Sequence, residues 1–167
     1  DLAKKAIECF EPYGEDEQRY ARAQFSMNAS CREPLLRLLG KVRRSSMNYD
    51  HDPEAALNAE QNVQVAVNAE RYYSNMMSFN DNTWNLRDTH MMKSLNRLFN
   101  FYGKASKGIV WAHNTHIGDA RFTDMKEQGM INIGQLAREE KGEKNVVLIG
   151  FGSYEGSVIA ATAWGGA

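Results

Sequence analysis

The 167-residue chain has the size and composition of one globular domain, with 43% hydrophobic residues, 25% charged residues and a formal net charge of −1. This charge gives no general attraction to nucleic acid or to an anionic membrane surface, so we expect neither as a partner. No run approaches about 18 consecutive apolar residues, so no membrane-spanning helix is predicted. Cys9 and Cys31 lack CxxC spacing, and we predict reduced thiols in a cytoplasmic protein, with one disulfide as the alternative.

Residues 1–103 form the predicted helical segment. Ser30 and Glu33 have the spacing of a capping box at the start of one helix. Asp52 and Pro53 suit the N-cap and first position of a longer helix, whose apolar residues then recur every three or four positions. We therefore predict that this long helix buries one face.

A second long helix is predicted from Trp84 to a C-cap at Gly103. Arg87 and Asp88 fall on its apolar stripe, and Glu70 falls on the apolar face of the preceding helix. A charged residue on an inward face is costly unless it is paired or lies in a wet cleft. Two interpretations remain open: a structural ion pair between Glu70 and Arg87, or a pocket into which Arg87 projects to hold a carboxylate or an oxyanion.

Residues 108–167 form a predicted α/β segment. The expected elements are a helix from about residue 132 to 142 and three apolar strands, "GIVWA" (108–112), "NVVLIGFG" (145–152) and "SVIAATAW" (157–164). A strand, a helix and a strand in this order favour a right-handed parallel crossover, and the short "SYEG" favours a final hairpin. The predicted fold class is α/β, with a helical first half followed by a small, mostly parallel sheet that ends in a hairpin.

Two of the four histidines, His113 and His116, follow the first predicted strand with Asn114 between them. Ligands gather at the carboxyl ends of parallel strands, where imidazole serves as a general acid or base or as a metal ligand. The structural alternative is a pair that caps or packs. His90 lies one helical turn beyond Arg87, and faces either the pocket proposed for Arg87 or the surface.

Several motifs resemble, in the same order, those of the erythromycin esterase family, some of whose members are labelled succinoglycan biosynthesis proteins. The resemblance covers nearly the whole chain. Its motifs here are "CFEPYGED", "NAEQNVQVAVNAERYYSNM", "WNLRDTHM", "VWAHNTHIGDARFTDM", "INIGQLAR" and "VVLIGFGSYEGSV".

The resemblance implies an α/β hydrolytic domain with a helical insertion that cleaves esters such as a macrolide lactone. A histidine with carboxylate help would activate water, without a covalent serine intermediate. Carried over by motif, the catalytic candidates are His113 and His116 of "AHNTH" and Arg87 of "WNLRD", with His116 expected to participate directly. We add three candidates for substrate binding, Asn114, Asp88 and Glu70.

The family's other catalytic histidine and its glutamates come from a segment that precedes these motifs. The sequence therefore predicts a piece of a longer protein, with little turnover of its own and apolar sheet edges that favour self-association. The expected substrate is a small ester or lactone, and no cofactor is expected. Two other functions stay open: a non-catalytic module that binds small molecules, and a metal-dependent hydrolase with His113 and His116 as ligands.

Overall fold

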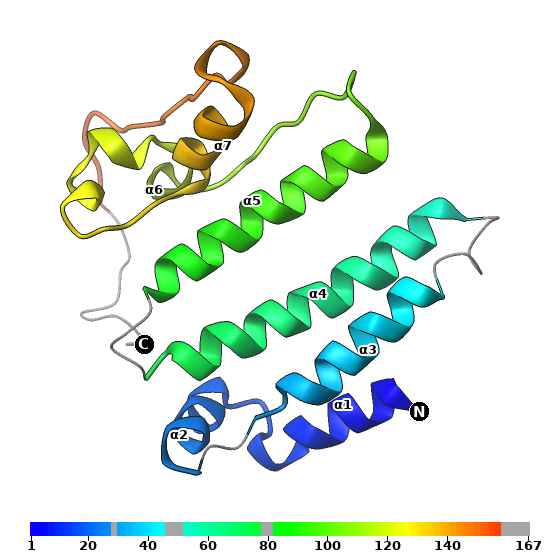
Figure 1. Cartoon of the computed structure of the whole chain (residues 1–167). Coiled ribbons are helices and arrows are strands. Elements are labelled where there is room, and N and C mark those ends of the chain that lie inside the picture. Colours follow the sequence, from blue (N-terminus) through cyan, green and yellow to red (C-terminus); the bar gives the residue numbers. More distant parts are fainter. Residues whose placement is uncertain (28–29, 46–51, 78–81, 158–167) are drawn as a thin grey trace.

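A computed structural model describes residues 1–27, 30–45, 52–77 and 82–157, and Figure 1 shows their arrangement. Within these ranges every regular element is a helix. In chain order they are α1 (Leu2–Phe10), η1 (Glu11–Tyr13), α2 (Glu17–Met27), α3 (Arg32–Arg44), α4 (Pro53–Asn75), α5 (Thr83–Tyr102), α6 (Asn114–Ile117), η3 (Ala120–Phe122), η4 (Asp124–Lys126), α7 (Ile133–Lys141) and η5 (Glu143–Asn145).

The predicted α/β fold is wrong for the described residues, which contain no strand or sheet. The runs at 108–112 and 146–152 adopt no regular structure, and they leave Ile109 95% exposed and Val147 83% exposed. An apolar run becomes a buried strand only where another strand completes its backbone hydrogen bonds, and neither run has such a partner among the residues that the structure describes. Residues 158–164 of the third predicted strand, and with them the predicted hairpin, lie outside the described residues.

The main apolar core lies where α3 packs between α1 and α4 (Figure 1). Its buried side chains are Ala6, Leu35, Leu39 and Val67. The predicted long helix is confirmed: the Asp52 carboxylate accepts a hydrogen bond from the Ala55 backbone N–H at 2.9 Å, directly before Pro53. A local cap thus sets the start of α4, and its apolar face completes the core.

The start of α3 differs from the predicted capping box. Cys31 is the N-cap residue, and its side chain makes no capping hydrogen bond. The Ser30 hydroxyl accepts from the Arg32 backbone N–H at 3.2 Å and donates to Glu70 at 3.2 Å. The reciprocal pairing with Glu33 does not form, because the helix begins one residue later than predicted and the hydroxyl oxygen accepts from Arg32 instead.

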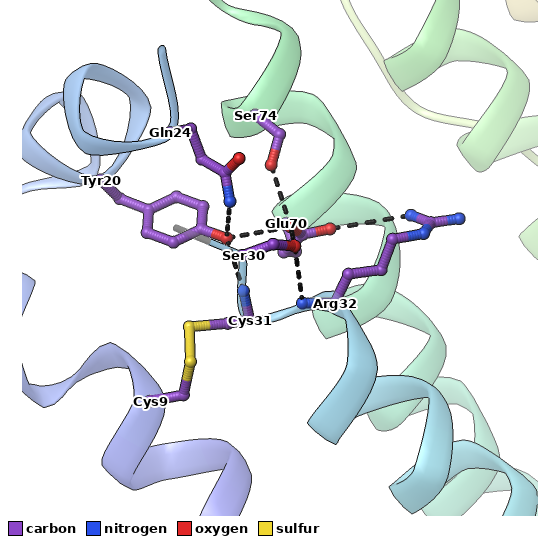
Figure 2. The surroundings of a disulfide bond; sticks show 8 residues. All are labelled: Cys9, Tyr20, Gln24, Ser30, Cys31, Arg32, Glu70 and Ser74. Carbon is purple, nitrogen blue, oxygen red and sulfur yellow. Dashed lines mark hydrogen bonds and ion pairs between the residues drawn. A yellow bond between two sulfur atoms is a disulfide. The ribbon is translucent and has the colours of Figure 1, made fainter. Parts of the chain in front are cut away.

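Cys9 and Cys31 form a disulfide that joins the end of α1 to the start of α3 (Figure 2). The prediction of reduced thiols is therefore wrong. Their separation of 22 residues carried no CxxC signal, and only the packing of α1 against α3 brings the two Cα atoms to 5.7 Å.

The second long helix, α5, runs antiparallel to α4, and α7 packs against α5 (Figure 1). The predicted end of α5 at Gly103 is confirmed, with φ at +90°. The predicted helix near 132–142 is also confirmed, since Asn132 caps α7 and Gly142 ends it with φ at +85°. These helices hold the "WNLRD" and "AHNTH" segments against each other.

Candidate functional site

His116 and Asp88 form a direct pair at the interface of α5, α6 and α7. Asp88 is fully buried, and the ring nitrogen Nδ1 of His116 lies 2.9 and 3.0 Å from its two carboxylate oxygens. The Ile133 backbone N–H, in the first turn of α7, donates to Asp88 Oδ2 at 3.1 Å. Because an ionised carboxylate only accepts hydrogen bonds, this geometry puts a proton on His116 Nδ1.

The other nitrogen of His116, Nε2, faces Arg87. Nε2 lies 3.5 Å from Arg87 Nη2, so in the neutral imidazole its lone pair is directed at a guanidinium donor. At the long limit of hydrogen bonding this contact is weak. Asp88 and Arg87 thus hold the two nitrogens of one imidazole in different roles.

Trp84 lies beside both groups. Its ring stacks on the His116 ring with a centroid distance of 4.5 Å and an interplanar angle of 1°, and Arg87 Cζ lies 4.9 Å from the Trp84 centroid. The indole N–H donates to the Ile131 carbonyl at 2.8 Å, which fixes the ring. Trp84 therefore limits how far His116 and Arg87 can turn.

The local sequence explains why these groups converge. Trp84, Arg87 and Asp88 stand at positions i, i+3 and i+4 of α5, which share one helix face. The facing N-terminus of α7 offers backbone N–H groups without partners in the helix, together with the positive end of its dipole. A buried carboxylate on α5 can therefore be satisfied from α7 and from His116 at once.

Burial raises the pKa of the Asp88 carboxyl above its ordinary value. The hydrogen bond and charge of His116, the Ile133 N–H and the charge of Arg87 oppose that rise. The ionised form of Asp88 consequently depends on the groups that contact it.

His113 and Asn114 occupy different environments from His116. His113 is exposed and is the N-cap of α6, where its Nδ1 accepts from the Thr115 backbone N–H at 3.3 Å. The Asn114 side chain donates to the Phe151 carbonyl at 2.5 Å and accepts from the Phe151 N–H at 3.1 Å. The structure thus gives His113 a capping contact and uses Asn114 to join two segments.

Glu70, on α4, points toward α2 and α3 and away from the His116 cluster (Figure 2). Its carboxylate accepts hydrogen bonds from Tyr20 at 2.9 Å and Ser74 at 2.9 Å, and it lies 3.7 Å from the Arg32 guanidinium. Arg87 contacts Trp84 and His116 instead, so the ion pair considered between Glu70 and Arg87 does not form. The inward position of Glu70 is explained by this polar cluster with α2 and α3.

A family model described as erythromycin esterase matches residues 1–167, the whole chain. The chain belongs to the erythromycin esterase family. Membership of this family suggests hydrolase activity. No solved structure matches the chain.

In this erythromycin esterase family chain, reasoning from sequence missed Trp84 as a site residue. Trp84 begins the predicted helix, and an apolar residue at that position indicates only packing. The available signal was its spacing of three residues from Arg87, which put both on one face. The backbone donor from Ile133 could not be read from any side-chain pattern.

The described part of this family member contains no group of three or more His, Cys, Asp or Glu side chains that could hold a metal ion. His116 also fits poorly as a ligand, because Nδ1 is bound to Asp88 and Nε2 faces the positive charge of Arg87. The residues of this cluster alone therefore do not make a metal centre.

Proposed function

We propose that this chain supplies a histidine–carboxylate–arginine group, His116, Asp88 and Arg87, to a hydrolase that cleaves an ester or lactone with water. The observation that carries the proposal is the orientation of His116. A buried carboxylate holds its Nδ1–H, which leaves the Nε2 lone pair beside a guanidinium. A general base and a donor for a developing oxyanion are the two groups that such hydrolysis needs.

In the proposed reaction the carbonyl oxygen of the substrate accepts hydrogen bonds from Arg87. The weak contact between Arg87 and His116 Nε2 is then lost. His116 Nε2 accepts a proton from water as the water oxygen attacks the carbonyl carbon, and Asp88 stabilises the imidazolium. Arg87 stabilises the oxyanion until the ester C–O bond breaks. His116 then returns its proton to the leaving alkoxide, giving a carboxylic acid and an alcohol.

We propose different roles for the other candidates. Asp88 acts through His116, so it is a positioning residue rather than a substrate ligand. His113 keeps Nε2 free of its capping contact, and we propose that it orients water from there. Asn114 and Glu70 support neighbouring segments, and their direct contact with substrate carries less support.

The resemblance implies that a further histidine and glutamates, from a segment that precedes these motifs in the family, complete the site. We therefore propose that turnover belongs to the longer protein and that residues 1–167 alone hydrolyse little. To test this, the longer protein and residues 1–167 are each incubated with a panel of simple esters and a macrolide lactone. Mass spectrometry then detects the addition of water to each substrate.

His116→Ala in the longer protein tests the proposal. We expect hydrolysis to fall by roughly 10²-fold or more, because a general acid or base contributes about that much. Asn100→Ala, an exposed change on the same helix as Asp88, is the control for general damage. Full activity of the His116 variant would remove His116 from the mechanism.

Two results would favour the other functions. Binding of an ester without hydrolysis, even in the longer protein, would indicate a non-catalytic binding module. Loss of activity with a chelator, and its return with added metal, would indicate a metal-dependent hydrolase in which other residues complete a site with His113 or His116.

The cytoplasmic location was predicted from reduced cysteines, and the disulfide removes that basis. Disulfides persist mainly in oxidising compartments, so we propose that the chain functions in one. No helix in the described ranges has both the length and the apolar character needed to cross a membrane. The proposed partner is a small ester or lactone, without nucleic acid.

A further inference from the structure

A cavity of about 310 Å³ lies between α4 and α5, and shares none of its lining residues with the His116 cluster. Its lining is mostly polar and consists of Asn68, Arg71, Asn82, Asn85, Leu86, Thr89, His90 and Lys93. This volume is at the lower end of the range for small-molecule sites, about 300–1,000 Å³. Nothing in the proposed hydrolysis uses these side chains.

The charges in this cavity have one sign. Arg71 and Lys93 line it from different helices, and no Asp or Glu is among its lining residues. Neither cation has an ion-pair partner among the residues that the structure describes. Two cations beside the same cavity raise its positive potential, and an anion between them lowers the electrostatic energy.

His90 provides an uncharged donor at the same place. The Asn68 amide nitrogen Nδ2 lies 3.0 Å from His90 Nδ1, and since an amide NH₂ only donates, Nδ1 accepts and Nε2 carries the ring proton. Burial lowers the pKa of His90, and the charges of Arg97 and Lys93 lower it further. Of the groups near it, Arg97, Lys93 and Arg71 are all cationic, so the surroundings of His90 are positive without an anion.

The N-terminus of α5 adds to this field. Asn82 is both the N-cap of this 20-residue helix and part of the cavity wall, so the positive end of the helix dipole borders the cavity. Asn85 holds that wall in place, because its amide donates to the Gly129 carbonyl at 2.9 Å and accepts from the Ile131 N–H at 2.8 Å. Thr89 adds a hydroxyl to the lining.

We infer that this cavity binds the oxyanion group, a carboxylate or a phosphate, of a small molecule, with Arg71 and Lys93 as the charged ligands. Arg71 can hold two oxygens with its planar guanidinium, and Lys93 supplies a point charge. His90 and Thr89 complete the set of donors. The cavity is larger than one oxyanion, so the remainder of the molecule also fits in it.

The histidine resonances of the whole 167-residue chain, followed by NMR over a pH titration, test this inference. The probes are inorganic phosphate and acetate at matched ionic strength, with chloride as the reference salt. We expect one of the probes to raise the apparent pKa of His90, because a bound anion stabilises the imidazolium, and the His113 resonance is the reference from outside the cavity. A response to phosphate alone or to acetate alone identifies the class of anion.

Arg71→Gln and Lys93→Gln are the test variants, and Lys104→Gln is the matched control, an exposed lysine outside the cavity. Each test variant should bind the effective probe roughly tenfold more weakly, since a hydrogen bond to a charged group commonly has this effect. Lys93→Gln should also raise the pKa of His90 without any anion. Circular dichroism checks that each variant keeps its helices.

Two results would overturn the inference. The first is a His90 resonance that responds to neither probe beyond the chloride reference. The second is an equal response in the control and in both test variants, which would show only general screening by salt.

Discussion

Asp88 determines which nitrogen of His116 carries the proton, and so which nitrogen is left to act as a base. With the carboxylate, Nδ1–H is the donor and the Nε2 lone pair faces Arg87. An asparagine would keep the shape and could still accept from the Ile133 N–H. Its NH₂ group would then face Nδ1 and force the ring proton onto Nε2, opposite the Arg87 donors.

Asp88→Asn is therefore expected to exchange the tautomer of His116 while the fold is retained. Nitrogen NMR shifts of the His116 ring report this directly, without a substrate. Hydrolysis by the longer protein should fall by roughly 10²-fold or more, because the base is lost. An unchanged Nδ1–H tautomer in the variant would show that Asp88 does not set it.

The pKa of Asp119 is lowered, whereas that of Asp88 is raised. Hydrogen bonds from Arg121 hold the pKa of Asp119 below its ordinary value, although burial opposes them, and Arg138 on α7 adds a further bond at 3.3 Å. A folded-state pKa below the unfolded value means that the unfolded chain binds a proton first as the pH falls. The stability from this carboxylate is thus present above the unfolded pKa of about 4, and it is lost as the pH falls through the folded value.

Asp119→Asn tests this linkage. The variant should unfold at lower urea concentration than the parent near neutral pH, and the gap between their free energies of unfolding should narrow below about pH 4. Urea titrations from neutral to acid pH measure it. A gap that stays constant over the whole range would mean that the charge of Asp119 contributes nothing.

At the scale of elements, the contact between α6 and α7 explains how His116 reaches α5. Gly134, in the first turn of α7, is buried, and a Cβ atom built on it would overlap the carbonyl oxygens of Ile117 and Gly118. These are backbone atoms, so they cannot turn aside as a side chain would. The closeness of α7 to the segment that carries His116 therefore requires a residue without Cβ.

Gly134→Ala is expected to destabilise the chain by about 1–3 kcal/mol, the usual cost of overpacking, although alanine favours a helix by itself. The ring of His116 should also lose its stacking on Trp84, which the ring-current shift of its protons reports. Gly152→Ala is the matched control, because nothing lies within 4 Å of its Cβ position. Equal stability of the two variants would contradict the close contact.

The elements that sequence predicted correctly are those set by neighbours in the chain. Asp52 before Pro53, Gly103 and Asn132 all act within one helical turn, so their side chains or backbone angles specify the helix ends locally. The strand near Ile109 failed because a strand needs partners that are distant in sequence. The Ser30 capping box failed because the helix begins one residue later, with Cys31 as its N-cap, and the Ser30 hydroxyl accepts from Arg32.

The candidate site follows the same division. Charged residues on the apolar face of α5 indicated Arg87 and Asp88 as candidates. The two histidines indicated the segment that contacts them. No periodicity could show that Asp88 binds His116 rather than a substrate, or that Glu70 faces Tyr20. Those assignments depend on how α4, α5 and α7 pack against their neighbours.

At the scale of the whole molecule, the two irregular apolar runs contact each other and both expose apolar side chains. Trp111 and Phe151 bring the runs together, with ring centroids 5.7 Å apart, and Asn114 joins them through the Phe151 backbone. Ile109 is 95% exposed and Val147 83% exposed on the same runs. Exposed apolar side chains that gather in this way favour association.

We expect residues 1–167 to self-associate, with a sedimentation coefficient that rises with protein concentration. Ile109→Lys with Val147→Lys should shift the chain toward monomer, because both side chains would place a charge in the contact at little cost to the fold. Phe25→Lys is the control, because it also replaces an exposed apolar side chain (73% exposed) but lies on α2, and it should leave association unchanged. A parent chain that stays monomeric at all concentrations would show that this surface does not bind a second copy. An equal effect of the double variant and of Phe25→Lys would show that the contact lies elsewhere.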